Sequence, residues 1–328
     1  MAQSARPQYQ ASLALQIGYF IRLGRPLHLV GGLVFNGLGI AIAGYLGVAI
    51  RWPVAIWCQL IITSTQLMTH FSNDYFDQDA DAATVIPTRW AGGSRVLPEG
   101  LIHPRGALIA AVVCGGLALA VIAGLAFRQD VSPMTIWLFL LAVFLAWSYS
   151  SPPLWLNRHG LGEITGAILV PGITTLLGFM AQAGKFNLIP VLAAVPLVFI
   201  QFAMLVSVNF PDFAGDTLVN KRTLVVIVGP ERGARLFAGS LFLAYLLLPL
   251  LVMAGLPLLV AISVLPMLPI AVWQGWRIHN QAAIDPTQWN ALAFWSIGLL
   301  IGSALLETAA FLVGSRTNRS LDSSQPTG

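Results

Sequence analysis

The chain has 328 residues, of which 57% are hydrophobic and only 9% are charged, and its mean hydropathy is +0.78. Soluble domains carry about 25% charged residues, so this composition excludes an ordinary soluble protein and indicates an all-α polytopic membrane protein. The net charge of +4 comes from loop residues, and no basic and aromatic face is present, so we expect no nucleic-acid partner.

Nine apolar runs are long enough to cross a bilayer as helices, which need about 20 residues each. Residues 1–26 precede them, and we expect this segment to lie in the cytoplasm or at the membrane interface. The predicted membrane domain covers 27–314, and the polar tail over 315–328 is expected to be disordered. The predicted spans are 27–49, 53–72, 107–127, 134–150, 162–183, 188–209, 236–255, 256–274 and 290–313.

Positive charge is concentrated on one side of these spans. Of the 17 Lys and Arg residues, 12 lie in the N-terminal segment and in the loops after the even-numbered spans, and the other five lie on the opposite side. Because cytoplasmic loops are enriched in Lys and Arg, we expect a cytoplasmic N-terminus and a C-terminus outside. The two longest loops on the cytoplasmic side, roughly 73–106 and 210–235, are expected to act as lids.

Two matching acidic clusters follow the second and sixth spans, on the same side of the membrane. They read Asn73-Asp74-Tyr75-Phe76-Asp77-Gln78-Asp79-Ala80-Asp81 and Val208-Asn209-Phe210-Pro211-Asp212-Phe213-Ala214-Gly215-Asp216. Sliding one onto the other pairs Asp77 with Asp212, Asp81 with Asp216 and Asp74 with Asn209. The shared spacing of i, i+3 and i+7 places the oxygen ligands on one face of a helix, although Pro211 is expected to kink the second one.

Like-charged carboxylates on one stripe repel each other, and the negative end of the helix dipole adds to the cost. A divalent cation removes this repulsion, and carboxylate oxygens are the ligands that Mg2+ prefers. Asp79 points away from the stripe and is expected to be a solvated charge. The sequence therefore predicts a metal site formed by Asp74, Asp77, Asp81, Asp212 and Asp216.

Cations held by carboxylates favour an anionic partner, usually a phosphorylated ligand. Polar and basic residues on the cytoplasmic side are candidates to bind it: Asn73, Asn209, Lys221, Arg222, Arg25, Arg89 and Arg95. Tyr149 ends the fourth span on this side, where its ring suits a phosphate hydrogen bond or a nearby cation, or an ordinary interfacial position. Glu307, in the last span toward the far face, is left without an assigned role.

The motif Asn73-Asp74-x-x-Asp77-x-x-x-Asp81 resembles the first signature of the UbiA superfamily of intramembrane prenyltransferases, and Asp212-x-x-x-Asp216 resembles the second. Val208 and Pro211 depart from the superfamily's 1,4-dihydroxy-2-naphthoate branch, where an asparagine and a basic residue are common. Other segments resemble that branch: Gly92-Gly93-Ser94-Arg95-Val96-Leu97-Pro98-Glu99-Gly100, Tyr149-Ser150 through Gly160-Leu161-Gly162-Glu163, and Lys221-Arg222-Thr223-Leu224.

The resemblance implies a bundle of about nine helices around a pocket in the membrane, here the bacterial inner membrane. Two Mg2+ ions, held by both clusters, would bind the diphosphate of a polyprenyl donor. The implied reaction transfers the prenyl group to an aromatic acceptor, 1,4-dihydroxy-2-naphthoate, in menaquinone-type quinone synthesis. The five aspartates and Tyr149 would be its catalytic residues, with the tyrosine ring shielding an allylic cation that an electron-rich ring attacks.

Three alternatives remain at this point. Within the same enzyme class, the acceptor is homogentisate or a benzoquinone precursor. A transporter for divalent cations or phosphorylated solutes would bind its substrate near the bilayer midplane between broken helices, whereas these acids lie at one surface and repeat in parallel. A non-catalytic lipid-binding or assembly protein would need no carboxylates at metal-ligand spacing.

Overall fold

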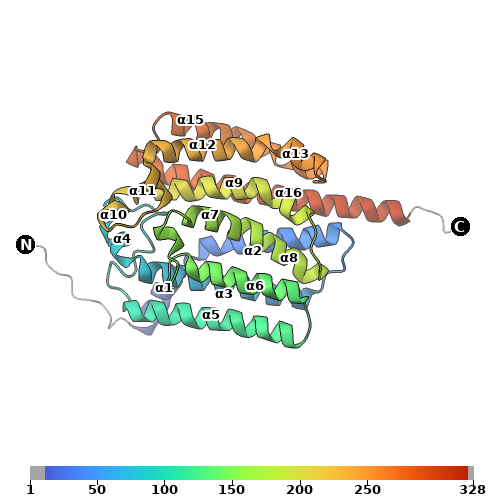
Figure 1. Cartoon of the computed structure of the whole chain (residues 1–328), viewed down its shortest axis with the longest axis horizontal. Coiled ribbons are helices and arrows are strands. Elements are labelled where there is room, and N and C mark those ends of the chain that lie inside the picture. The colour runs from blue at the N-terminus through green and yellow to red at the C-terminus, as the bar shows by residue number, and fades with distance from the viewer. Residues whose placement is uncertain (1–11, 324–328) are drawn as a thin grey trace, which may run out of the picture.

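The computed structural model describes residues 12–323, and these form a bundle of roughly parallel helices (Figure 1). Within that range the structure contains no strand, only one isolated bridge between His159 and Arg222. The all-α prediction is therefore confirmed. The first half contains α1 (Leu13–Gly24), α2 (Pro26–Tyr45), α3 (Trp52–Phe76), α4 (Gln78–Ala83), α5 (Pro104–Phe127), α6 (Pro133–Ser148), η1 (Leu156–Arg158), α7 (Gly162–Ala167), η2 (Ile168–Ile173) and α8 (Thr174–Ala183).

The second half of the bundle begins after a short turn and ends in the longest helix. Its elements are α9 (Ile189–Asn209), α10 (Phe213–Leu218), α11 (Leu224–Val228), α12 (Pro230–Leu246), α13 (Leu248–Met253), α14 (Leu258–Ser263), η3 (Leu265–Met267), α15 (Leu268–His279) and α16 (Pro286–Ser323). Helix α16 continues into the predicted polar tail as far as Ser323, and residues 324–328 lie outside the described range. Helix α1 occupies part of the predicted N-terminal segment.

Seven helical segments in the described part of the chain are long and apolar enough to cross a membrane. They correspond to seven of the predicted spans, whereas 53–72 and 134–150 coincide with α3 and α6, which are outside this set. Helix α6 has only 16 residues, and α3 carries polar side chains along its length. Some of these bond inside the bundle, such as Gln59, which accepts from Asn36 at 3.0 Å and donates to Thr63 at 2.9 Å. The count of nine spans stays a prediction.

Large apolar side chains occupy both the interior and the outer surface of the bundle. Phe35, Phe179, Phe237 and Phe311 are fully buried where α2, α8, α12 and α16 meet α9. Many other large apolar side chains on the long helices are exposed, for example Ile109 on α5. An outer surface this apolar suits lipid, because lipid-facing helices need no polar covering.

The two loops predicted as lids meet at one end of the bundle, where α4, α10 and α11 lie together (Figure 1). Gly215 makes the closest approach, because a Cβ atom there would stand 2.9 Å from the backbone of Ala83 and of Thr84. Helix α10 therefore packs directly on the end of α4. This contact brings together two loops that are more than a hundred residues apart in the chain.

Candidate active site

The first acidic cluster lies where α3 gives way to α4. Helix α3 ends at Phe76 and α4 starts at Gln78, so the backbone departs from helical geometry at Asp77 and the predicted continuous helical face is interrupted there. Asp74, Asp77 and Asp81 are nevertheless all buried, the first two with only 1% of their surface exposed. Asp79 is exposed, so it is separated from the other three as expected.

The second cluster has the same construction. Helix α9 ends at Asn209 and α10 begins at Phe213, and Pro211 lies in the turn between them, as its missing N–H and fixed φ favour. Asp216 is buried with 1% exposure, and Asp212 is partly buried. Both clusters thus combine the end of a long helix with a six-residue helix that follows it.

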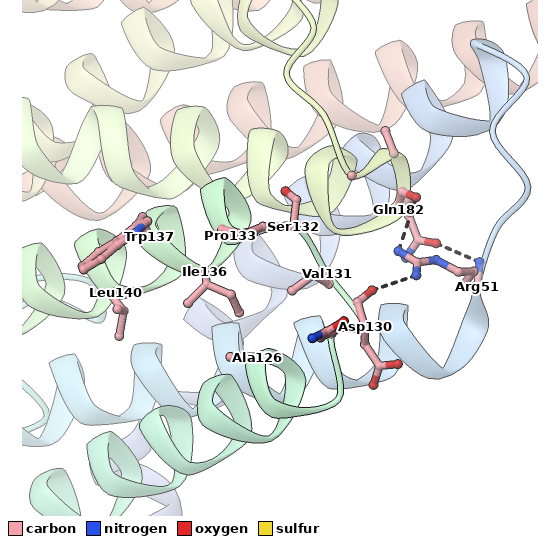
Figure 2. Close-up of a pocket in the computed structure, with 13 residues that line it drawn as sticks. Arg51, Ala126, Asp130, Val131, Ser132, Pro133, Ile136, Trp137, Leu140 and Gln182 are labelled. Carbon is pink, nitrogen blue, oxygen red and sulfur yellow. Dashed lines mark hydrogen bonds between the residues drawn. The ribbon is translucent and has the colours of Figure 1, made fainter.

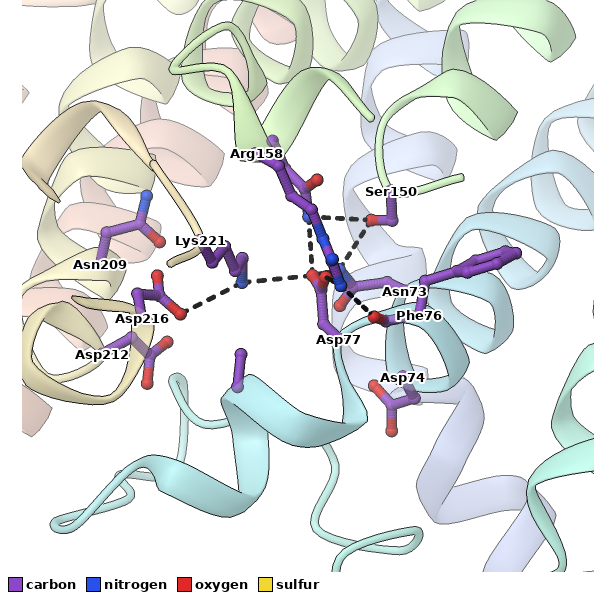
Figure 3. A network of polar contacts seen from close by, with 12 residues as sticks. Asn73, Asp74, Phe76, Asp77, Ser150, Arg158, Asn209, Asp212, Asp216 and Lys221 are labelled. Carbon is purple, nitrogen blue, oxygen red and sulfur yellow. Dashed lines mark hydrogen bonds and ion pairs between the residues drawn. The ribbon is translucent and has the colours of Figure 1, made fainter. Parts of the chain in front are cut away.

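Lys221 connects the two clusters directly (Figure 3). Its Nζ atom lies 3.2 Å from Oδ2 of Asp77 and 3.4 Å from Oδ1 of Asp216. The chain reaches this position because Asn220 adopts a left-handed φ of 56° and the Lys221 N–H donates to the Asp216 carbonyl at 2.8 Å. Burial lowers the pKa of Lys221, but Asp77 and Asp216 outweigh that effect and the net pKa is raised. Lys221 is therefore a permanent positive charge between the clusters.

Asp77 is the most heavily bonded carboxylate of the site. Its Oδ2 atom accepts hydrogen bonds from Asn73 at 2.8 Å and from Asn157 at 2.6 Å, and both amides also donate to Ser150 Oγ (Figure 3). Arg158 donates to the Phe76 carbonyl and lies 3.5 Å from Asp77 Oδ1. Sequence reasoning missed Ser150, Asn157 and Arg158 as site residues. Two signals were available: the segment 149–163 resembles the naphthoate branch, and Asn157 and Arg158 lie in a loop on the same predicted side.

Asp74 pairs with a different cation. Arg25, in a left-handed turn between α1 and α2, forms an ion pair with Asp74 Oδ1, and Ser94 donates its N–H and hydroxyl to Oδ2. Burial opposes the charged form of Arg25, yet Asp74 and Asp81 raise its pKa overall. Arg95 also reaches the first cluster, but its guanidinium donates to the backbone carbonyl of Asp81 and not to a carboxylate.

The first lid also holds the second cluster. Asp212 accepts hydrogen bonds from Thr84 Oγ1 at 3.0 Å and from the Gly92 N–H at 3.2 Å. The next residue, Gly93, has a φ of 70°, and a Cβ atom there would stand 1.9 Å from Asp81 Oδ2. The pair of glycines thus lets the lid backbone lie directly against both clusters.

Asn209 faces a partner that sequence reasoning did not assign. Its Nδ2 atom donates to Oε1 of Glu163 at 2.6 Å, and the Leu224 N–H donates to the same oxygen at 3.0 Å. Glu163 lies at the start of α7 and is buried. Tyr149 is close by, because a Cβ atom on Gly162 would stand 3.4 Å from its ring.

Two predicted ligands lie apart from the acids. Arg89 is exposed, stacks on the Trp90 ring at 5.3 Å and donates its N–H to Asn290 at 3.0 Å. Arg222 is also exposed, and its backbone forms the bridge to His159. Both side chains extend from lid loops. The direction in which such a side chain points depends on the loop conformation, which residue spacing does not determine.

The buried acids exceed the positive charge around them. Burial raises the pKa of Asp81 and Asp212, and that of Asp216 to about 7. One oxygen each of Asp81 and Asp216 is buried without a hydrogen-bond partner. Among the described residues, no three Asp, Glu, His or Cys side chains are grouped closely enough to hold a metal by themselves. The donor set still fits a hard cation shared with an anionic ligand, because unpartnered carboxylate oxygens are what such an ion requires.

Residues 31–311 match the model of the UbiA prenyltransferase family. The chain belongs to that family. It is therefore a prenyltransferase and an integral membrane protein, and the resemblance seen in the two aspartate motifs is confirmed. The transporter and the non-catalytic alternatives are set aside by this match.

Curated relatives of this UbiA family member are named for different reactions. The 1,4-dihydroxy-2-naphthoate octaprenyltransferase of Mycobacterium leprae is 27% identical over 66% of this chain and 71% of its own. The digeranylgeranylglyceryl phosphate synthase of Natronomonas pharaonis is 28% identical over 90% of this chain and 95% of its own. The family is thus established, whereas the relatives leave the acceptor open.

Solved structures share the fold. A digeranylgeranylglyceryl phosphate synthase matches with a TM-score of 0.63 and 14% identity over 92% of this chain and 99% of its own. A UbiA homologue from Archaeoglobus fulgidus, bound to DMAPP and Mg2+, matches with a TM-score of 0.58 and 15% identity over the same shares of the two chains. A prenyl diphosphate and Mg2+ thus bind together in a protein of this fold.

Proposed function

We propose that this enzyme transfers a polyprenyl group from its diphosphate to an aromatic acceptor, 1,4-dihydroxy-2-naphthoate, in a Mg2+-dependent reaction of menaquinone-type quinone synthesis. The proposal that the site binds the diphosphate donor rests on the position of Lys221, whose ammonium lies between Asp77 and Asp216. A diphosphate bound at this point would face acids of both clusters and a fixed cation. We also propose that this end of the bundle faces the cytoplasm of a bacterial inner membrane, as the distribution of Lys and Arg favours.

The residues that would hold Mg2+ are Asp74, Asp77, Asp81, Asp212 and Asp216, and two ions would match the two clusters. When bound, Mg2+ supplies positive charge that stabilises the departing diphosphate. Arg25 and Lys221 contribute two further charges that the protein holds in place before the reaction starts. Asn73 and Arg158 orient Asp77, and Arg95 ties the lid to α4.

The reaction follows from this arrangement. The C–O bond between the allylic carbon and the diphosphate breaks, and the negative charge that builds on the leaving oxygen is stabilised by Arg25 and Lys221. The electron-rich ring of the acceptor forms the new C–C bond and then loses a proton. The buried position of the site under two lids excludes water that would capture the cation. We propose that the Tyr149 ring shields that cation from the side of α7.

The naphthoate acceptor is supported by three segments, at 92–100, 149–163 and 221–224, that resemble that branch. A second candidate acceptor is a prenylated glyceryl phosphate, because the Natronomonas synthase aligns over 90% of this chain. Homogentisate and benzoquinone precursors complete the set. All four would use the same donor site, so the acceptor is a separate question from the metal.

The test is a transfer assay on the purified enzyme with Mg2+, a labelled polyprenyl diphosphate and each acceptor alone. We expect prenylated naphthoate and free diphosphate, and no turnover after chelation with EDTA. Preferred turnover of the glyceryl phosphate would overturn the naphthoate assignment but leave the donor site intact. Full turnover in EDTA would overturn the role of the metal.

A further inference from the structure

A cavity lies at the other end of the bundle from the acids. Helix α3 connects the two places, since it begins at Trp52 beside the cavity and ends at Phe76 beside Asp77. At 1.5 Å per residue, these 25 residues separate the two sites by about 37 Å, close to the thickness of a bilayer. Whatever binds in this cavity therefore lies at the opposite membrane surface and does not contact the reacting atoms.

Three segments line this cavity, which we name the Arg51 groove. They are Arg51 itself, residues 126–140 around the turn from α5 to α6, and residues 182–184 at the end of α8 (Figure 2). Its volume is about 800 Å3, large enough for a small molecule or a lipid headgroup with part of a chain. Such a groove differs from the acidic site because its wall is largely apolar.

Arg51 gives the groove its charge. Its guanidinium donates to the carbonyl oxygens of Asp130 at 2.7 Å and Ala181 at 2.6 Å, which fixes its position across three segments (Figure 2). A third, longer bond of 3.5 Å goes to the Gln182 carbonyl, and because a guanidinium has five N–H donors, others are left over. Within residues 12–316, no carboxylate pairs with Arg51, because the carboxylate of Asp130 pairs with Arg128 at 2.9 Å. Asp130 also lines the groove, but Arg128 neutralises its carboxylate, so the charge of Arg51 is not offset by a carboxylate partner.

Gln182 provides a second donor. Its Oε1 atom accepts the backbone N–H of Arg51 at 2.8 Å, which fixes the orientation of the amide. Its Nε2 atom is buried and has no hydrogen-bond partner, and the residue is only 5% exposed. A buried unsatisfied donor is costly and calls for a partner. An anionic oxygen in the groove, next to Arg51, would be that partner.

The apolar wall indicates what carries this anion. Ile136, Trp137 and Leu140 line the groove on α6, and Trp137 is 71% exposed. Farther along the same helix, Leu141 and Phe144 are also exposed, so the wall continues onto the lipid-facing surface. Tryptophan is enriched where headgroups meet acyl chains. A ligand with an anionic head and a long apolar chain fits both parts of the groove.

We propose that the Arg51 groove binds one anionic phospholipid, with its phosphate on Arg51 and Gln182 and an acyl chain along α6. This lipid would lie at the membrane surface opposite the acidic site. The proposal does not depend on the acceptor of the prenyl group.

The experiment is a titration of phosphatidylglycerol onto the delipidated full-length enzyme in neutral detergent, with bound lipids counted by native mass spectrometry. Gln182→Glu keeps the oxygen that accepts from Arg51 but replaces the free donor with a second acceptor. We expect it to weaken the first binding event about tenfold or more, which corresponds to the loss of a charge-assisted hydrogen bond. Arg51→Gln should weaken it similarly.

The matched control is Lys185→Gln, because Lys185 is an exposed cation near the end of α8 that does not line the groove. We expect it to bind phosphatidylglycerol as the wild type does. Trp137→Ala should weaken long-chain phosphatidylglycerol more than a short-chain form. Thermal unfolding of each variant in lipid-free detergent shows whether the fold is retained.

Four results would overturn the proposal. Unchanged lipid affinity in folded Gln182→Glu would remove the headgroup contact, and an equal loss in Lys185→Gln would indicate a general attraction to surface charge. Displacement of the lipid by inorganic phosphate at equal concentration would show a site for the free anion. Displacement by a neutral polyprenol would assign the groove to an isoprenoid chain instead.

Discussion

The two acidic clusters match in sequence, yet each is held by a loop from the other half of the chain. Asp77 in the first cluster pairs with Lys221, which belongs to the second lid. Its counterpart Asp212 accepts hydrogen bonds from Thr84 and Gly92, which belong to the first lid. Each cluster therefore depends on the lid loop of the other half of the chain for some of its polar contacts.

The clusters differ most at their first position. Asp74 is paired with Arg25, whereas the matching Asn209 donates to the carboxylate of Glu163. The first cluster thus has an acid neutralised by a cation, whereas the second has an uncharged amide that donates a hydrogen bond to an acid. The two halves therefore share geometry but carry unequal charge, since the first cluster has three buried carboxylates and the second has an amide at the matching first position.

The largest expected effect comes from removing a matched carboxylate from either cluster. Asp77→Asn and Asp212→Asn each preserve side-chain shape, and we expect each to reduce turnover by about a thousandfold, as loss of a preorganised charge does at other active sites. The transfer assay measures this. Asp79→Asn is the control because Asp79 is exposed. A loss in Asp79→Asn equal to that in Asp77→Asn would contradict the division of roles.

Lys221→Met removes the two ion pairs that connect the clusters. We expect turnover to fall about a hundredfold, because the leaving diphosphate loses one fixed charge. The variant should also unfold at lower temperature in EDTA than in Mg2+, since the carboxylates that Lys221 neutralised need another cation. Arg222→Gln, at the adjacent exposed residue, should behave as wild type in both measurements. Loss of turnover in Arg222→Gln alone would show that Arg222, and not Lys221, stabilises the leaving diphosphate.

The packing of the two lids is tested at Gly215. Gly215→Ala places a methyl group against the backbone of Ala83 and Thr84, which cannot yield as a flexible side chain does. We expect about a tenfold loss of turnover, in the range found when catalytic groups are displaced by a fraction of an ångström. Gly37→Ala is the control, because a Cβ atom there meets open space. Equal activity in the two variants would show that contact between α4 and α10 is dispensable.

The smallest expected effect is at Ser94, which supports Asp74 alongside Arg25. Ser94→Ala removes the hydroxyl hydrogen bond but keeps the backbone N–H and the ion pair. We expect the KM for the prenyl diphosphate to rise several-fold with little change in kcat, since one hydrogen bond to the carboxylate is lost while the N–H bond and the ion pair still hold it. A kinetic titration of the donor measures both constants. An unchanged KM with a collapse of kcat would contradict this positioning role.

Residue spacing predicted some features of the site, but not the contacts that depend on how distant loops fold. The spacing separated Asp79, which is exposed, from the other aspartates, and Pro211 was expected to kink the second helix, which ends at Asn209. These follow from local rules of helix geometry. Their position on the predicted cytoplasmic side made Arg25 and Lys221 candidates, and both contact the acids.

Other residues depend on how distant loops fold. Asn157 lies 80 positions from Asp77, and nothing in the helical pattern links them. The pairing of Asn209 with Glu163 likewise requires α7 and α9 to pack together. Arg222 was predicted as a ligand together with Lys221, but the left-handed turn at Asn220 brings only the lysine to the acids. Loop backbone angles, which sequence spacing does not encode, decide these directions.

The central claim is that the two clusters act as one site for Mg2+ and a diphosphate. Calorimetric binding of an unreactive prenyl thiodiphosphate, with and without Mg2+, tests this in the wild type, Asp77→Asn, Asp212→Asn and the double variant. We predict Mg2+-dependent binding that either single change weakens strongly but measurably, with the double variant no weaker than the singles because the two residues act as a unit. Binding that persists without Mg2+, or losses that simply add in the double variant, would contradict the claim.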